Sequence, residues 1–432
     1  MTELALTVVF LTILFLFLGT GIWVAMSLIG VAAIGMVLFT DRPVGDAMAT
    51  TIWGAASSWT LTALPLFIWM GEILFRTRLS ENLFKGLTPL MRHLPGGLLH
   101  VNIAGCTLFA AISGSSAATV ATVGKMSIPE LRSRGYPERM ITGTLAGAGT
   151  LGLLIPPSIT LIIYGVTVNE SIAKLFVAGV LPGLMLALLF MGYVAVWGLL
   201  QGKREERPAE SDTGSARDVL QLIPIVALIL GVIGSIYTGV ATATEAAVLG
   251  VVGALVLSGL QGSLNRTSLV ESLLGATRTS SMIAFILAGS TFLSLAMGFT
   301  GLPRSLAIWI GALELAPWML VVALAIFYII LGCFLDGISA IVLTMAIIEP
   351  LVREAGFDMI WFGIFLMVVV EMAQITPPVG FNLFVLQGMT GRDMAFIARA
   401  AAPMFLLMVV AVVLLSLFPE IATFLPNAMS DR

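Results

Sequence analysis

The chain alternates long apolar stretches with short polar interruptions along almost its whole length. We interpret ten of these stretches as membrane crossings, because a helix rises about 1.5 Å per residue and the hydrocarbon core is about 30 Å thick. They lie near residues 4–18, 22–39, 58–76, 138–168, 176–200, 219–235, 241–260, 281–299, 358–390 and 402–418. This pattern predicts an all-α polytopic membrane protein with five crossings in each half.

Two further apolar stretches, near 96–131 and 317–352, each contain a polar break. The first break reads Ser113-Gly114-Ser115-Ser116 and the second reads Asp336-Gly337-Ile338-Ser339. Each arm is short for a full crossing, and irregular backbone at membrane depth is tolerated only inside protein or beside a water-filled cavity. We therefore predict two re-entrant hairpins with the polar breaks at their buried tips.

An internal repeat relates the two halves of the chain. Pro156-Pro157 recurs as Pro377-Pro378, 221 residues later. The upstream residues Pro129, Arg132 and Gly135 recur at the same spacing as Pro350, Arg353 and Gly356. Proline breaks the helix that precedes it, and paired broken helices are the best sequence indication of a transporter's binding site.

The repeat predicts a division into two units joined by a polar linker. The first unit covers 1–200, with hairpin 96–131 and broken helix 138–168. The second covers 218–432, with hairpin 317–352 and broken helix 358–390. Because five crossings is an odd number, the second repeat is expected to be inverted relative to the first.

The basic residues predict the orientation, since Lys and Arg concentrate in cytoplasmic loops. With linker 201–217 placed in the cytoplasm, only five of the 21 Lys and Arg residues remain outside: Arg42, Lys174, Arg304, Arg353 and Arg432. Both termini are then periplasmic or extracellular, and the hairpins enter from opposite sides. Segments 47–57, 80–93 and 262–279 mix charged and apolar residues and are expected to lie along the interface.

Composition excludes several protein classes. The chain is 59% hydrophobic and 10% charged, whereas a soluble domain is about one quarter charged. A net charge of -3 argues against nucleic acid as a partner. Two cysteines and two histidines are too few for a Cys or His metal cluster.

The first tip and the first proline break carry candidate ligand groups. Hydroxyl and carbonyl oxygens suit a hard cation such as Na+, and a helix N-terminus suits a carboxylate. The cation candidates are Ser113, Gly114, Ser115 and Pro156. The substrate candidates are Ser115, Ser116, Ala117 and Ser158. Close packing of small residues between helices is the alternative explanation.

The second half is more polar at the corresponding positions. The cation candidates here are Asp336, Gly337, Ser339, Thr376 and Pro377, and the substrate candidates are Ser339, Val379, Gly380 and Asn382. An acid at membrane depth is costly and indicates function, so Asp336 is the strongest candidate, with helix capping as its structural alternative. Glu371 could tune ion affinity, carry a proton or be a buried acid satisfied by hydroxyls.

Two further features bear on the site. Gly143, Gly147, Gly149 and Gly152 leave one face of the helix before Pro156 almost bare, which permits close approach by the hairpin. No arginine lies in the core of either broken helix. An anionic substrate would therefore be held by helix N-termini, hydroxyls and bound cations.

Four motifs resemble those of a known family, and the likeness covers essentially the whole chain. They are Gly114-Ser115-Ser116-Ala117-Ala118-Thr119, Arg134-Gly135-Tyr136-Pro137, Ile155-Pro156-Pro157-Ser158 and Thr376-Pro377-Pro378-Val379-Gly380. In these the chain resembles the large membrane subunit of tripartite ATP-independent periplasmic (TRAP) transporters, the DctM-like permeases.

The resemblance implies an elevator-type ion transporter fold in the bacterial inner membrane. It also implies import of organic acids, such as C4-dicarboxylates, driven by a Na+ gradient. A periplasmic substrate-binding protein would deliver the substrate. A small four-helix membrane subunit would be a separate chain.

Three other functions were weighed. A self-sufficient Na+- or H+-coupled dicarboxylate carrier of the same superfamily stays open. An ion channel is disfavoured, because two opposed hairpins in one chain do not form a ring of identical filters. An enzyme is disfavoured, because the sequence has no His-Glu-x-x-His motif and no Gly-x-Ser-x-Gly elbow.

Overall fold

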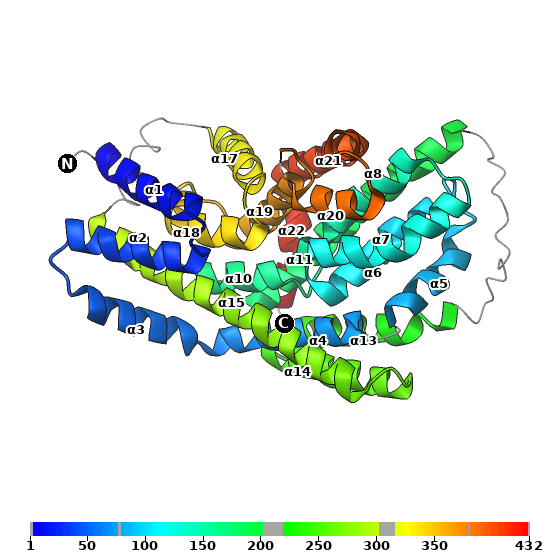
Figure 1. Ribbon diagram of the computed structural model, residues 1–432, viewed down its shortest axis with the longest axis horizontal. Coiled ribbons are helices and arrows are strands. Elements are labelled where there is room, and N and C mark those ends of the chain that lie inside the picture. Colours follow the sequence, from blue (N-terminus) through cyan, green and yellow to red (C-terminus); the bar gives the residue numbers. More distant parts are fainter. Residues whose placement is uncertain (1–2, 77–78, 202–218, 302–315, 379, 431–432) are drawn as a thin grey trace.

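The computed structural model describes residues 3–76, 79–201, 219–301, 316–378 and 380–430 (Figure 1). All regular elements in these ranges are helices, which confirms the all-α prediction. The elements of the first half are α1 (Glu3–Gly19), α2 (Val24–Phe39), α3 (Val44–Ala56), η1 (Trp59–Thr62), α4 (Ala63–Phe75), α5 (Leu79–Met91), α6 (Leu99–Ser113), α7 (Ser116–Ser133), α8 (Glu138–Gly149), α9 (Leu151–Leu154), α10 (Ile159–Val168) and α11 (Ile172–Gln201). Those of the second half are α13 (Ile223–Tyr237), α14 (Ala243–Leu260), α15 (Arg266–Thr300), α17 (Pro317–Gly332), α18 (Gly337–Glu354), α19 (Met359–Gln374), α20 (Phe381–Thr390), α21 (Met394–Leu417) and α22 (Glu420–Ser430). Residues 202–217 of the predicted linker lie outside the described ranges.

The two helix pairs α6–α7 and α17–α18 are divided at the polar breaks expected from the sequence. Helix α6 ends at Gly114, whose φ of 57° favours glycine. Helix α7 then begins with Ser115 as its N-cap. In the second pair, α17 ends at Gly332 and Asp336 caps the start of α18. Local capping chemistry therefore defines both tips.

Both proline pairs interrupt a helix. Glu138–Leu154 and Ile159–Val168 meet at an angle of 41° across Pro156-Pro157. The break between α19 and α20 contains Pro377-Pro378. Both Pro-Pro peptide bonds are cis.

Each half packs one hairpin helix against a broken helix of the other half. Helix α7 of the first half packs on α20 of the second, and α18 of the second packs on α10 of the first. The Arg132 guanidinium donates to the Thr390 carbonyl at 3.2 Å, and that of Arg353 donates to the Val168 carbonyl at 2.9 Å. These carbonyls end α20 and α10, where the helix dipole favours a cation. Two arginines related by the sequence repeat thus make equivalent contacts across the halves.

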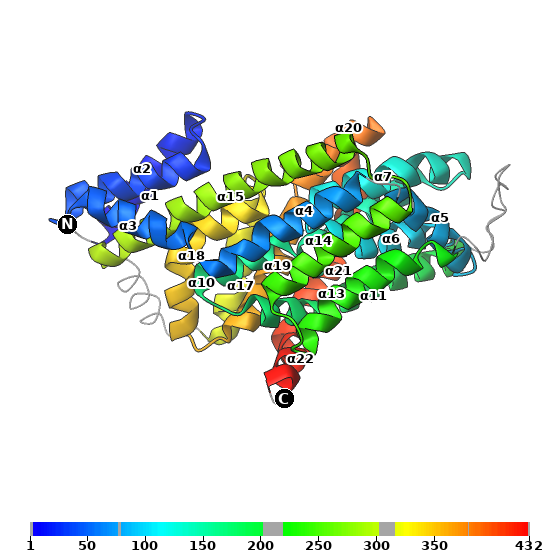
Figure 2. The ribbon, with the colours of Figure 1, turned by 90° about the horizontal axis from the view of Figure 1, so that it is seen from below.

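Helix α15 differs from the prediction. Segments 262–279 and 281–299 were expected to be an interfacial helix and a separate crossing, but Arg266–Thr300 is one helix of 35 residues. No proline or glycine lies between Thr277 and Leu287 to interrupt it. Asn265 and Ser268 form a capping box at its start. It packs against α2, α3, α4 and α18, and Figure 2 shows it running beside α4, which lies between α15 and α14.

The helices differ in how well they fit a membrane by length and composition. Within the described residues, four single helices are long and apolar enough to cross, and two bent pairs raise this number to six. The four are α11, α14, α15 and α21. The other crossings of the predicted ten depend on shorter helices such as α2 and α13 and stay a prediction. Helix α22 had no counterpart in the sequence analysis.

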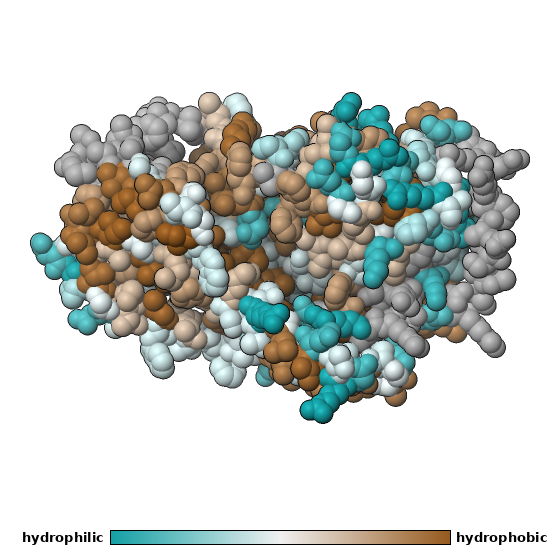
Figure 3. Space-filling view, in the orientation of Figure 1, coloured by the Kyte–Doolittle hydropathy of each residue, from teal (hydrophilic) through white to brown (hydrophobic). Residues whose placement is uncertain are grey.

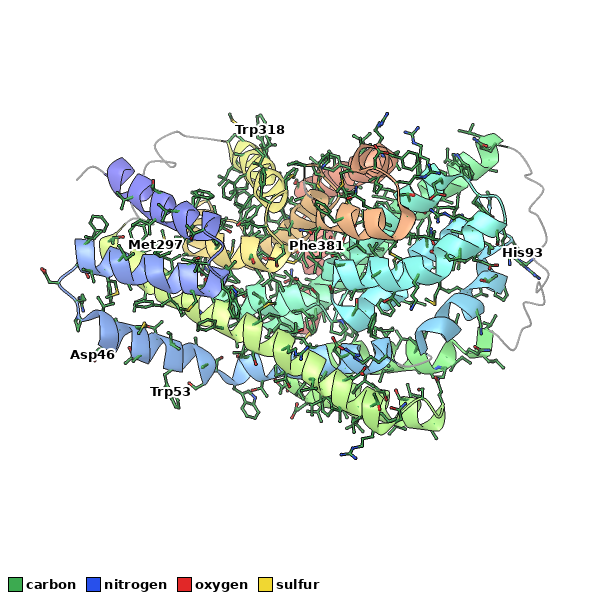
Figure 4. All side chains as sticks on the ribbon, viewed as in Figure 1. Asp46, Trp53, His93, Met297, Trp318 and Phe381 are labelled. Carbon is green, nitrogen blue, oxygen red and sulfur yellow. The ribbon has the colours of Figure 1, made fainter. Side chains whose placement is uncertain are left out.

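The surface is divided into apolar and hydrophilic regions. Figure 3 shows a mostly apolar area over α2 and a hydrophilic area over the ends of α20 and α21. Val37 and Leu38 of α2 are exposed. Trp53 and Trp318 point outward from α3 and α17 in Figure 4, as expected of side chains that face lipid or the membrane interface.

The contact of α8 with α21 provides a test of the packing. A Cβ at Gly143 would overlap the carbonyl oxygen of Ala400, whereas a Cβ at Gly192 of α11 would meet nothing within 4 Å. We expect Gly143→Ala to lower the free energy of unfolding by about 1–3 kcal/mol through overpacking. Gly192→Ala should leave it unchanged or slightly raised. Thermal unfolding of the purified variants in detergent measures the difference, and equal melting temperatures would contradict this packing.

Candidate functional site

The first hairpin tip lies directly on the first proline break. A Cβ at Gly114 would lie 3.1 Å from both the Pro157 carbonyl oxygen and the Ile159 nitrogen. A Cβ at Gly152 would lie only 2.6 Å from the nitrogen of Ser116. Side chains at these two positions would separate the tip from the break. The structure thus brings together Ser113–Ser116 and Pro156–Ser158, which the sequence had paired.

Hydroxyl groups satisfy much of the freed backbone here. Ser113 and Thr119 share a hydrogen bond of 2.8 Å, and Ser115 Oγ accepts from the Ala118 amide at 3.5 Å. Buried Ser158 donates to the Leu153 carbonyl at 2.5 Å and accepts from the Leu161 amide at 3.3 Å. Ser158 therefore closes the break by joining the end of α9 to the start of α10.

The second tip lies against the second broken helix. The Cys333 thiol donates to the Pro377 carbonyl at 3.5 Å. A Cβ at Gly332 would lie 2.6 Å from that of Ala373, and one at Gly337 would lie 3.0 Å from a methyl group of Leu153. The second tip thus contacts both its own broken helix and the first proline break.

This second tip is also more open than the first. Asp336 and Pro377 are exposed, and Phe381 at the start of α20 is 51% exposed (Figure 4). Pro156 and Ser158 in the first break are buried. Ser339 is buried, Thr376 is half-buried and donates to the Met372 carbonyl at 2.7 Å, and Val379 lies outside the described residues.

Asp336 has the capping geometry that was its structural alternative. Its carboxylate accepts from the amides of Ile338 at 3.1 Å and Ser339 at 3.3 Å. Capping uses one oxygen, Oδ2, in both contacts. A cation-ligand role for Asp336 stays a prediction.

Glu371 joins the two halves at their centre. This side chain of α19 is 1% exposed. Its Oε1 accepts a hydrogen bond from the Ser116 hydroxyl and another from the Leu153 amide at 3.1 Å. One carboxylate of the second half therefore holds both the first tip and the first break. The sequence analysis named Glu371 and Ser116 but not Leu153, because a backbone amide leaves no signal in residue type.

Asn382 of α20 and Gln374 of α19 are buried polar residues. Within the described ranges, neither the oxygen nor the nitrogen of the Asn382 amide has a hydrogen-bond partner, and Gln374 Nε2 has none. Asn382 lies near Gly149 and Val120, away from the first tip. The glycine face of the first broken helix contacts two different helices. Gly149 and Gly152 contact α7, whereas Gly143 and Gly147 contact α21.

A cavity of about 250 Å³ opens beside the first tip. Ser113, Ser115 and Ala118 line it on the hairpin side. Ile68, Gly71, Glu72 and Phe75 of α4 and Thr279 of α15 line the opposite wall. The cavity thus lies between the first tip and the helices α4 and α15.

Comparison with known proteins identifies the family. The model of the tripartite ATP-independent periplasmic transporter, DctM component, matches residues 11–421. The chain belongs to this family. It is thus a TRAP transporter large permease, as the sequence motifs predicted.

Relatives of this DctM permease differ in the substrates that they are named for. The C4-dicarboxylate TRAP transporter large permease protein DctM of Pseudomonas aeruginosa is 34% identical, over 91% of this chain and 92% of that protein. The ectoine/5-hydroxyectoine permease UehC of Ruegeria pomeroyi is 32% identical, over 96% and 97%. The solved structure of the Alcanivorax borkumensis YdaH transporter is similar in fold, with a TM-score of 0.69, 12% identity and coverage of 92% of this chain and 96% of that one.

The closure of the first break by Ser158 can be tested within helix α10. Ser158→Ala removes the cap of Leu161 and the partner of the Leu153 carbonyl. We expect it to lower the free energy of unfolding by about 1–2 kcal/mol. Thr167→Ala on the same helix removes a hydroxyl that only bonds back to Ile163, so its effect should be close to zero. Thermal unfolding in detergent compares them, and equal stabilities would show that Ser158 does not close the break.

Proposed function

We propose that this DctM permease imports small organic acids, C4-dicarboxylates or similar carboxylates, across the bacterial inner membrane by an elevator mechanism driven by a Na+ gradient. The observation that carries this proposal is the contact of the first tip with the first break beside a cavity of about 250 Å³. There a helix start, hydroxyl groups and a cavity occur together.

The substrate class follows from the groups that face this contact. Helix α7 begins at Ser116 and α10 begins at Ile159, and Gly114 lies against the Ile159 nitrogen. The positive end of a helix dipole and its free amides favour a carboxylate. Relatives named for C4-dicarboxylates and for ectoine support small organic solutes as substrates.

Na+ suits the oxygen groups that the tips present. Among the described residues, no three His, Cys, Asp or Glu side chains lie close enough together to hold a metal ion. The candidate oxygens are instead the hydroxyls of Ser113 and Ser115, the carboxylate of Asp336 and carbonyls near the proline breaks. Hard oxygen donors of this kind favour a hard cation.

The proposed motion follows from the packing. The exchanged contacts of α7 with α20 and of α18 with α10 tie the hairpins and broken helices into one interlocked block, which we call the transport block. The layer of α4, α14 and α15 packs together on the other side of the cavity. We propose that the transport block moves against this layer, with both chain termini in the periplasm. The tripartite system supplies a periplasmic binding protein and a small four-helix subunit as a separate chain.

The decisive test is uptake by proteoliposomes that hold this chain and its small subunit. A radiolabelled dicarboxylate is supplied on a candidate binding protein, with and without an inward Na+ gradient. We expect uptake only when both the gradient and the binding protein are present. Na+-driven uptake without the binding protein would assign the chain to the self-sufficient carriers. Equal uptake with and without the Na+ gradient would contradict the proposal that Na+ drives transport.

The role of Asp336 can be separated from capping by its charge. Asp336→Asn keeps an oxygen that can accept from Ile338 and Ser339 but removes the negative charge. If Asp336 binds Na+, the Na+ concentration for half-maximal uptake should rise about 10-fold or more, a loss of about 1.4 kcal/mol. Asp358→Asn is the matched control, because Asp358 caps α19 in the same way, at 2.8 Å from two amides. A similar Na+ dependence in both variants would leave Asp336 as a cap only.

A further inference from the structure

Glu371 is a buried acid that neither caps a helix nor belongs to the proposed ligands of Na+ or substrate. It is 1% exposed, and its Oε1 accepts from a hydroxyl and an amide, both neutral and both from the first half of the chain. Its second oxygen, Oε2, has no hydrogen-bond partner among the described residues. Burying a carboxylate is costly unless it is well hydrogen-bonded. The hydrogen bonds that Oε1 accepts from Ser116 and Leu153 offset part of this cost.

The position related to Glu371 by the repeat makes a different contact. Thr150 lies 221 residues earlier, and its hydroxyl bonds to the Gly147 carbonyl at 2.6 Å and to the Met408 sulfur of α21 at 3.7 Å. Of these two related positions, Glu371 of the second half places a carboxylate on the other half, whereas Thr150 of the first half places only a hydroxyl there. This asymmetry contrasts with Arg132 and Arg353, which make matching contacts at the two ends.

Leu153 connects this contact to the second tip. Its amide donates to Glu371, its carbonyl accepts from Ser158, and its side chain lies against Gly337 at the start of α18. Ser116, the other partner of Glu371, is the first residue of α7 at the first tip. A displacement of either tip would therefore change the contacts of Glu371.

We propose that Glu371 is a positioning residue that couples the two tips. By holding Ser116 and Leu153 on one oxygen, it fixes the first tip relative to the break that the second tip also contacts. A cation bound at the first tip then raises cation affinity at the second, and the reverse follows by reciprocity. This inference rests on the proposed binding of Na+ at the tips.

Cys333 provides a reporter at the second tip. Its thiol bonds to the Pro377 carbonyl and is 5% exposed, so a thiol reagent reaches it only when the tip opens. The other cysteine, Cys106, is buried in α6 and can be replaced by alanine. The rate of Cys333 modification by N-ethylmaleimide is then measured against Na+ concentration, with K+ keeping the ionic strength constant. The full chain is used in proteoliposomes with its small subunit.

The variants change only the first tip and the coupling residue. Ser116→Ala removes one donor, Glu371→Ala removes the acceptor, and Glu371→Gln keeps a carbonyl oxygen that can accept both hydrogen bonds. Thr144→Val is the control, because it breaks a buried hydrogen bond of 2.9 Å from Asn102 on α6 to α8, away from the tips. If Glu371→Ala does not fold, Ser116→Ala still tests the coupling, because it removes only one of the two hydrogen bonds to Glu371.

We expect Na+ to slow Cys333 modification in the otherwise unchanged chain. Ser116→Ala and Glu371→Ala should raise the Na+ concentration at which the slowing of Cys333 modification is half-maximal. The expected rise is at least about 5-fold, the lower end of usual coupling between sites. In Glu371→Gln this Na+ concentration should stay within about 2-fold of that in the otherwise unchanged chain, because positioning needs the hydrogen-bond acceptor and not the charge. Thr144→Val should show no change.

Three other outcomes overturn the proposal in distinguishable ways. If Na+ slows modification equally in all variants, Na+ binds at the second tip but Glu371 does not couple the tips. If Glu371→Gln behaves like Glu371→Ala, the charge acts directly and positioning is wrong. If Na+ has no effect even in the unchanged chain, the proposed Na+ site itself fails, and the coupling fails with it.

Discussion

Backbone groups freed by the two helix breaks must find partners inside the protein, because the hydrocarbon offers none. This constraint explains four of the polar residues at the tips and breaks. Ser115, Ser158 and Asp336 each begin a helix and accept from amides that the break leaves free. Glu371 accepts from Leu153, in the short helix just before the first break. The residues that resemble a binding site are therefore first of all those that make the breaks possible.

The same groups retain capacity for a ligand. A carboxylate or hydroxyl oxygen has more than one lone pair, so a capping contact does not use up its ability to accept. In Asp336 both capping contacts are made by one oxygen. A tip that is held by its own caps needs little rearrangement when a cation arrives. Capping and ion binding are thus compatible roles of one side chain.

The sequence predicted the features that depend on local chemistry. Proline pairs, Gly114 and the N-cap residues determine where helices end, and these positions were found from residue type and spacing. The continuity of α15 was missed, because its polar segment 262–279 looked interfacial, although no breaker separates it from the apolar run. The link from Glu371 to Leu153 was not predictable, since it joins residues 218 positions apart through a backbone amide.

The contacts between the halves are symmetric at the ends and asymmetric in the middle. Arg132 and Arg353 each bond to the carbonyl that ends a broken helix of the other half, as expected for repeats that pack about a pseudo-two-fold axis. At the centre only the second half contributes an acid, and its partners all come from the first half. In the proposed elevator mechanism, the symmetric ends would let the two halves move as one body. The asymmetric centre, where Glu371 contacts the first tip and the first break, makes the two tips inequivalent.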